Sequence, residues 1–160
     1  MKPLKINSLT TSRSGAQTNF QNTYHLVFST RYREKTLDPI TKIKIRNLIR
    51  QKEEELKFFI YILNGYQDHI HILISIPNHF SISKIMQHIK GFSARQLNRG
   101  RFWQDGYYSR PISENELKTV YSYIRNQHFH HRNLANKNSI IDELEIIRSK
   151  KFVREVRKVG

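Results

Sequence analysis

The chain has 160 residues, a length that fits one domain with a single hydrophobic core. It carries 28 lysines and arginines against 13 aspartates and glutamates, so its formal net charge is +15. An excess of this size favours a polyanionic partner, with nucleic acid as the leading candidate and a membrane surface as the competitor. No apolar run approaches the about 20 residues of a spanning helix, and residues 1–15 lack the apolar core of a signal peptide. The absence of cysteine excludes disulfides and thiolate metal sites and suits a cytoplasmic protein. Because long apolar runs are lacking, we expect no membrane partner.

The first predicted elements are an arm, a strand and a helix. Residues 1–22 are rich in Ser, Thr, Asn and Lys and predict a flexible N-terminal arm. Alternation of apolar and polar residues over 23–29 predicts the first strand. Asp38 followed by Pro39 is an N-cap with a proline at the first helical position, which predicts a helix to about residue 55.

A hairpin and a second strand-helix unit follow. Residues 57–63 predict a second strand, and Asn64-Gly65 predicts the hairpin turn that leads into a third, antiparallel strand. The remaining segments of this unit are a third strand over 65–77, an amphipathic helix over about 81–97 and an irregular fourth strand over 101–112.

Two capping boxes predict the last helices. Ser113 with Glu116 starts a third helix, and Ser139 with Asp142 starts a C-terminal helix over about 139–158. The order β-α-β-β-α-β followed by helices predicts an α+β fold of the ferredoxin-like type with an antiparallel sheet. We expect one domain over residues 23–160.

Two histidines interrupt the apolar third strand. His69 and His71 share one face of that strand, and Ile70 and Ile72 share the other. The two histidines lie roughly 6 to 7 Å apart along the strand, close enough to bind one metal ion. Hydrogen bonds to backbone or neighbouring groups are the alternative, because an unpartnered imidazole in mid-sheet would cost a few kcal/mol. A metal site needs a third ligand from an element on the same side of the sheet, and we assign no role to His25 on the first strand.

Tyr123 and Gln127 provide a candidate nucleophile and a candidate ligand. They lie one helical turn apart, at the edge of an apolar stripe that includes Tyr121. In this position both side chains can reach the same point beside a sheet. An amphipathic surface pair is the alternative interpretation.

These two pairs together predict phosphodiester chemistry. A hydroxyl nucleophile beside a two-histidine metal site can attack a phosphodiester. Tyrosine has an ordinary pKa of about 10 and needs electrophilic help or a local base near neutrality. A phosphotyrosine product conserves the bond energy, so cutting and rejoining need no ATP or other nucleotide cofactor. Imidazole also suits zinc, so ligand chemistry leaves the metal open.

The segments Asp68-His69-Ile70-His71 and Tyr123-x-x-x-Gln127 resemble the two signature motifs of the single-tyrosine HUH transposases, which move insertion sequences as single-stranded DNA. The stretches YHLVFSTRYR, IKGFSARQL and FWQDGYY are similar to the family in the same order, so the likeness runs from about Thr23 to about Lys150. The chain departs from the family in its N-terminal arm and in SRPIS, where a proline precedes the third helix.

The resemblance implies that Tyr123 attacks single-stranded DNA, becomes linked to a 5′-phosphate and releases a 3′-OH. It implies that His69, His71 and Gln127 bind Mg²⁺ or Mn²⁺. It also implies recognition of DNA hairpins near the element ends, and a homodimer whose sheets join edge to edge. In such a dimer the tyrosine helix of one subunit can complete the site of the other.

Further basic and aromatic residues are weaker candidates. The candidates for phosphate contacts, with a solvated surface charge as the alternative for each, are Arg31, Arg33, Lys84, Lys90, Arg95 and Arg99. The candidates for base stacking, with core packing as the favoured alternative, are Trp103, Tyr107 and Tyr108. A second metal site is the disfavoured interpretation of His128, His130 and His131, because His128 falls on the apolar stripe.

Two other functions compete with transposition. A domesticated relative, a replication nickase or a relaxase would use the same chemistry, and strand transfer between two DNA ends separates a transposase from them. A ferredoxin-like binding module would grip nucleic acid through exposed aromatic residues on the central strands, where this sequence has histidines. A transposase that has lost catalysis would also be a binding protein.

Overall fold

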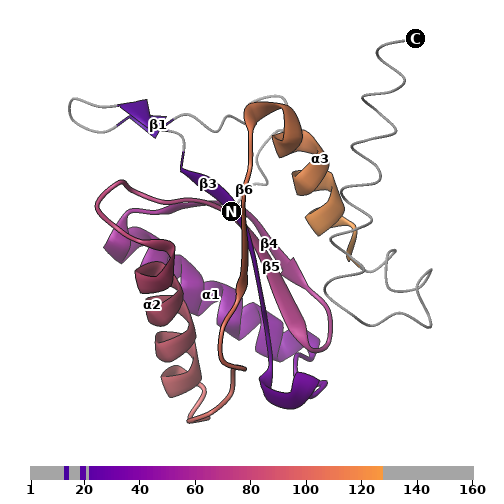
Figure 1. Ribbon diagram of the computed structural model, residues 1–160. Coiled ribbons are helices and arrows are strands. Elements are labelled where there is room, and N and C mark those ends of the chain that lie inside the picture. The colour runs from indigo at the N-terminus through magenta and orange to yellow at the C-terminus, as the bar shows by residue number, and fades with distance from the viewer. Residues whose placement is uncertain (1–12, 15–18, 21, 128–160) are drawn as a thin grey trace.

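The computed structural model describes residues 13–14, 19–20 and 22–127 (Figure 1). Four strands form an antiparallel sheet in the order β4-β5-β3-β6. The strands of this sheet are β3 (Thr23–Ser29), β4 (Phe59–Gly65), β5 (His69–Ser75) and β6 (Tyr108–Pro111), and the helices are α1 (Pro39–Leu56), α2 (Ile82–Gln96) and α3 (Glu114–Arg125). The chain order β3-α1-β4-β5-α2-β6, followed by α3, confirms the predicted ferredoxin-like α+β fold.

The ends of the chain are described only in part. Within the expected N-terminal arm, β1 (Arg13–Ser14) pairs antiparallel with β2 (Asn19–Phe20) in a small sheet of their own. The flexibility of this arm and the single domain over 23–160 stay predictions. The expected C-terminal helix over 139–158 and the histidines His128, His130 and His131 lie outside the described residues. No helix in the described ranges is long and apolar enough to cross a membrane.

The sheet separates two apolar layers because side chains on a strand alternate between its faces. Ile70 and Ile72 belong to the larger cluster with residues of α1 and α2, whereas Leu73 belongs to a second cluster with residues of α3. Figure 1 shows α1 and α2 together on one side of the sheet and α3 apart from them. His69 and His71 have the same parity as Leu73, so they lie on the α3 side of the sheet.

The predicted turn at Asn64-Gly65 is wrong, because β4 continues through both residues. Gly65 pairs with Ile70, and the connection is formed by Tyr66 to Asp68. Gly65 is needed for a close approach of backbones, since a Cβ atom there would collide with the backbone oxygen of His69. Asn64 and Gly65 thus form the last pairs of the β4–β5 ladder, where the two backbones approach closely.

Asn64 holds the C-terminal end of α3 on the sheet. Its Nδ2 donates to the backbone oxygens of Ile124 and Arg125, at 2.9 and 3.3 Å. Its Oδ1 accepts from the backbone N–H of Gly65 at 2.9 Å, which orients the amide. These carbonyls belong to the last turn of a helix, which has no partners for them within the helix itself. Because Asn64 lies opposite His71 in the ladder, this contact positions the end of α3 beside the histidines.

The N-terminal end of α3 is held by the predicted capping box. Glu116 accepts from the backbone N–H of Ser113 at 3.1 Å, and its other oxygen lies 2.7 Å from Nη1 of Arg110 in β6. Burial raises the pKa of Glu116, but the contacts with Arg110 and Ser113 outweigh it and bring the pKa to about 2. Pro111 closes β6 at the edge of the sheet, where its missing N–H costs no interior ladder bond.

We predict that Glu116→Gln lowers the melting temperature by a few degrees at pH 7. The depressed pKa means that this carboxylate stabilises the fold above its ordinary pKa of 4.5 and loses the effect as pH falls toward about 2. The difference between variant and wild type should therefore shrink over that interval in thermal melts followed by circular dichroism. Glu54→Gln, at an exposed position of α1, is the control. A difference that is independent of pH would contradict the assignment.

We also predict that Asn64→Ala reduces the free energy of unfolding by about 1 to 2 kcal/mol, because two helix-end carbonyls lose their donor. Asn64→Asp should cost more, since a carboxylate would face these carbonyls at the negative end of the helix dipole. Urea denaturation gives the free energies. Hydrogen exchange should show faster exchange confined to the second half of α3. Wild-type exchange in α3 of Asn64→Asp would refute this role.

Candidate active site

Two buried imidazoles form the centre of the candidate site. His69 and His71 are both 0% exposed, and their ring centroids lie 5.1 Å apart with the planes at 73°. Both come from β5, which lies between β4 and β3 inside the sheet. The structure therefore brings together the two histidines that the sequence singled out, on the face that α3 covers.

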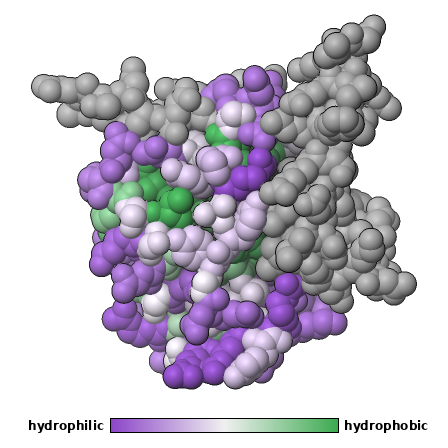
Figure 2. Space-filling model, viewed as in Figure 1, coloured by the Kyte–Doolittle hydropathy of each residue, from purple (hydrophilic) through white to green (hydrophobic). Residues whose placement is uncertain are grey.

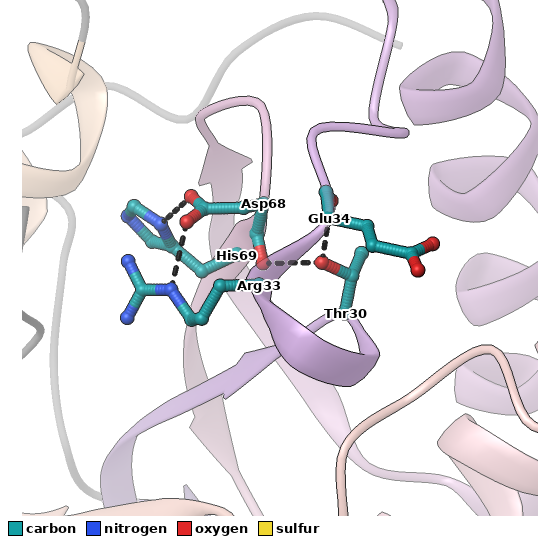
Figure 3. A network of polar contacts seen from close by, with 5 residues as sticks. All are labelled: Thr30, Arg33, Glu34, Asp68 and His69. Carbon is teal, nitrogen blue, oxygen red and sulfur yellow. Dashed lines mark hydrogen bonds and ion pairs between the residues drawn. The ribbon is translucent and has the colours of Figure 1, made fainter.

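His69 is oriented by a carboxylate and a guanidinium (Figure 3). Its Nδ1 lies 2.7 Å from Oδ1 of Asp68, and Oδ2 of Asp68 lies 2.7 Å from Nε of Arg33. Burial raises the pKa of Asp68, but the hydrogen bonds and charges of His69 and Arg33 outweigh it and leave the pKa below its ordinary value. Because a carboxylate only accepts hydrogen bonds, Nδ1 of His69 carries a hydrogen, and in the neutral form of the ring the lone pair is on Nε2.

His71 is oriented by a histidine to which the sequence gave no role. Nε2 of His25 lies 2.8 Å from Nδ1 of His71, and the two rings stack with centroids 5.1 Å apart. His25 is 0% exposed and comes from β3, which pairs directly with β5. With the hydrogen on Nδ1 of His71, that ring also presents the lone pair of Nε2. The alternation of 23–29, combined with the neighbouring first and third strands of a ferredoxin-like sheet, could have indicated this contact.

Tyr123 lies against this pair, and its expected place at the rim of the helix is wrong. Its side chain is 5% exposed, and its ring meets that of His71 edge to face, with centroids 5.8 Å apart. Gln127, two residues beyond the end of α3, is 0% exposed. Tyr123 is buried because α3 presents a wider arc to the sheet than its apolar stripe alone. Tyr121 is core, as predicted.

The donor set fits a divalent metal ion. Neither Oε1 nor Nε2 of Gln127 has a hydrogen-bond partner among the described residues, although both atoms are buried, and an unsatisfied buried amide is costly. Two imidazole nitrogens and this amide oxygen would form a three-ligand set, with Asp68 and His25 orienting the two rings. Across 22–127 and the two short strands, no three His, Cys, Asp or Glu side chains are grouped to hold a metal. The candidate site therefore depends on the amide.

The basic candidates for DNA contact lie in two places. Arg31 and Arg33 follow β3, and Nη2 of Arg31 donates to the hydroxyl of Tyr32 at 3.0 Å. On α2 and directly after it, across the sheet from α3, are Lys84, Lys90, Arg95 and Arg99. Lys90 donates to the backbone oxygens of Gln104 and Gly106 at 2.6 and 2.7 Å, and burial lowers its pKa. Polar side chains cover most of the described surface on the side seen in Figure 2. Phosphate contacts by these residues stay predictions.

The aromatic candidates pack into the protein. Trp103 is 7% exposed, and its Nε1 donates to Oγ of Ser93 at 2.9 Å, so its predicted core role is confirmed. Tyr107 and Tyr108 are half-buried against the two apolar clusters. In the part of the chain that the structure describes, the exposed large apolar side chains are Tyr32, Ile40 and Ile43, and none lies in a strand. The central strands thus lack the exposed aromatic face that a binding module of this fold would need.

Comparison with known proteins finds relatives among transposases. Residues 18–127 match the family model described as "Transposase IS200 like". The transposase for insertion sequence element IS200 of Salmonella typhimurium is 30% identical over 127 residues, covering 72% of this chain and 82% of that protein. The ISDra2 transposase TnpA of Deinococcus radiodurans is 25% identical over 120 residues, covering 68% of this chain and 86% of that protein.

Two solved structures share the fold. A putative transposase from Deinococcus radiodurans superposes with a TM-score of 0.57 at 22% identity, covering 72% of this chain and 97% of that one. A REP-associated tyrosine transposase bound to a REP hairpin gives 0.62 at 18% identity, covering 69% and 68%. The family model matches more than half of the chain, and the resemblance to the single-tyrosine HUH transposases is confirmed. The chain belongs to the family of IS200-like transposases.

Proposed function

We propose that this protein cleaves and rejoins single-stranded DNA at insertion-sequence ends through a covalent 5′-phosphotyrosine intermediate on Tyr123. The observation that carries the proposal is the contact of the Tyr123 ring with His71, 5.8 Å between centroids, over a buried pair of histidines. The net charge of +15 supports a nucleic-acid substrate. Membership of a transposase family supports a DNA-processing enzyme.

In the cleavage step, the hydroxyl oxygen of Tyr123 attacks the phosphorus atom and the phenol loses its proton. The bond between phosphorus and the 3′-oxygen breaks, and this oxygen takes up a proton and leaves as a 3′-OH. The downstream strand remains attached to the tyrosine through its 5′-phosphate. Attack of a 3′-OH on the phosphotyrosine reverses the step, restoring a phosphodiester and the phenol, so no nucleotide cofactor is consumed.

His69, His71 and Gln127 would hold the metal ion that this family implies, Mg²⁺ or Mn²⁺. When bound, such an ion polarises a phosphate oxygen and stabilises the charge that develops on it. Asp68 with Arg33 orients the ring of His69, and His25 orients the ring of His71. This positioning leaves Nε2 of each histidine as the nitrogen that would bind the metal ion.

Hairpin DNA and a second subunit complete the proposal. One relative of the same fold was solved bound to a REP hairpin, which makes a hairpin with a single-stranded flank the first substrate to try. A homodimer joined at a sheet edge would use β4 or β6, the outer strands of the sheet. The same chemistry on a repeated palindrome would make the protein a domesticated relative of these transposases.

We predict that wild-type protein, incubated with Mg²⁺ or Mn²⁺ and labelled single-stranded DNA from the flanks of its own gene, forms an adduct that survives denaturing electrophoresis. Tyr123→Phe should reduce adduct and cleavage by at least about 1,000-fold, because the nucleophile is gone, while DNA affinity changes little. Tyr121→Phe, at a buried tyrosine of α3 in the same apolar cluster, is the matched control and should retain the adduct.

An adduct in Tyr123→Phe would contradict the assignment of the nucleophile. Absence of an adduct with the wild type, on both strands and with both metals, would sink the catalytic proposal in favour of a binding protein. Joining of the released end to a second DNA end would separate a transposase from a nickase.

We predict that the protein without DNA binds Mn²⁺, and that His71→Ala and Gln127→Ala each weaken binding by at least about 10-fold. His25→Ala should weaken it less, because His25 acts through His71. Isothermal titration calorimetry or the free Mn²⁺ signal in electron paramagnetic resonance gives the affinities without relying on activity. His79→Ala, at an exposed histidine, is the control. Unchanged Mn²⁺ affinity in Gln127→Ala would remove Gln127 from the ligand set.

A further inference from the structure

Two adjacent residues after β3 have an unusual backbone conformation. Tyr32 and Arg33 have φ angles of 55° and 56°, in the left-handed region that residues with a side chain rarely adopt. The other non-glycine residues with positive φ in the described ranges, Lys57 and Asn98, are single and lie at the ends of α1 and α2, where such a conformation is common. Tyr32 and Arg33 are instead adjacent and belong to the short 3-10 helix Arg31–Arg33, and strain at two neighbouring residues calls for a functional reason.

The surrounding structure holds this strained segment on both sides. The backbone N–H of Thr30 donates to the oxygen of Asp68 at 2.8 Å, and that of Arg31 donates to the oxygen of Phe102 at 2.9 Å. The hydroxyl of Thr30 donates to the same Asp68 oxygen at 3.1 Å, and Arg33 forms its ion pair with the Asp68 carboxylate (Figure 3). The conformation at Tyr32 is therefore fixed by contacts that Tyr32 itself does not make.

The result of this conformation is an exposed aromatic ring. Tyr32 is 75% exposed, more than any other large apolar side chain that is described as exposed. The Arg31 guanidinium lies 4.8 Å from the centre of the ring and also donates to the hydroxyl. A ring so exposed contributes little to the core, and glycine would adopt this backbone with less strain. Fold stability therefore does not explain Tyr32.

The segment that carries the exposed ring is linked to the candidate site by strand pairing and hydrogen bonds. Ser29, at the end of β3, pairs with His69 at the start of β5. Arg33, the neighbour of Tyr32, reaches His69 through Asp68. The segment thus lies at the end of the sheet where the candidate metal ligands begin.

We propose that Tyr32 is a stacking platform for one unpaired base of the single-stranded DNA, close to the phosphate held at the candidate site. Arg31 steadies the ring and provides positive charge for the DNA backbone. Aromatic stacking suits a single strand because every base has a π-face, so the contact fixes the path of the strand more than its sequence. This inference rests on the proposed function of the site.

The first test measures affinity for single-stranded DNA by fluorescence anisotropy, with Tyr32→Ala, Tyr32→Phe and Tyr32→Gly. Tyr32→Ala and Tyr32→Gly should weaken binding by about 5- to 100-fold, and Tyr32→Phe should stay close to wild type. Tyr32→Gly should also raise the melting temperature by a few degrees, since glycine relieves the strain. Ile40→Ala, at an exposed apolar position of α1, is the control and should bind as wild type does.

The second test moves an abasic nucleotide along the DNA and repeats the measurement with wild type and Tyr32→Ala. At the stacked position the two losses should not add, because each removes the same contact. Equal affinity of Tyr32→Ala and wild type overturns the inference, and so do losses that add at every position. Since binding is measured without cleavage, a wild type that forms no adduct refutes the catalytic proposal alone.

Discussion

Burial of two imidazoles in the middle of a sheet obliges the neighbouring elements to supply hydrogen-bond partners. Asp68, at the start of β5, serves His69, and His25, on β3, serves His71. An imidazole left without them would cost a few kcal/mol in this position. Because Asp68 is itself a buried charge, it needs Arg33, which extends the network to the segment after β3. The site and the strained segment are therefore parts of one hydrogen-bonded structure.

Helix α3 places Tyr123 through contacts at its two ends. Glu116 ties the first turn to β6 through Arg110, and Asn64 ties the last turn to β4. Between these contacts the helix rests on Leu73 and on the histidine face of β5. The location of the tyrosine ring is thus set by side chains on three different elements, which is how a short helix can hold one side chain precisely against a sheet.

The fold and the histidine pair were predictable because the side chains of β5 alternate between the two faces of the sheet without a bulge. The face of one residue therefore determines the face of all the others. The role of His25 was missed because its contact with His71 exists only when β3 lies beside β5, and this pairing is part of the tertiary structure. The hairpin turn was predicted at the wrong residues because the turn preference of Asn-Gly does not take into account the close approach of Gly65 to the backbone of His69. Tyr123 was placed at a rim because helical periodicity counts apolar side chains, whereas the sheet beneath decides burial.

The positive charge of the chain and its local contacts have separate tasks. A net charge of +15 attracts DNA from a distance and falls off with salt. Near the candidate site, however, Arg33 is engaged with Asp68, while Lys84 and Arg95 lie across the sheet on α2. The charge of the protein alone therefore does not determine where a DNA strand enters the candidate site. Tyr32 lies two residues after Thr30, which forms an isolated bridge with Trp103. On our proposal its exposed ring would supply a short-range contact that salt does not screen. A contact of this kind would account for the left-handed backbone at Tyr32 and Arg33.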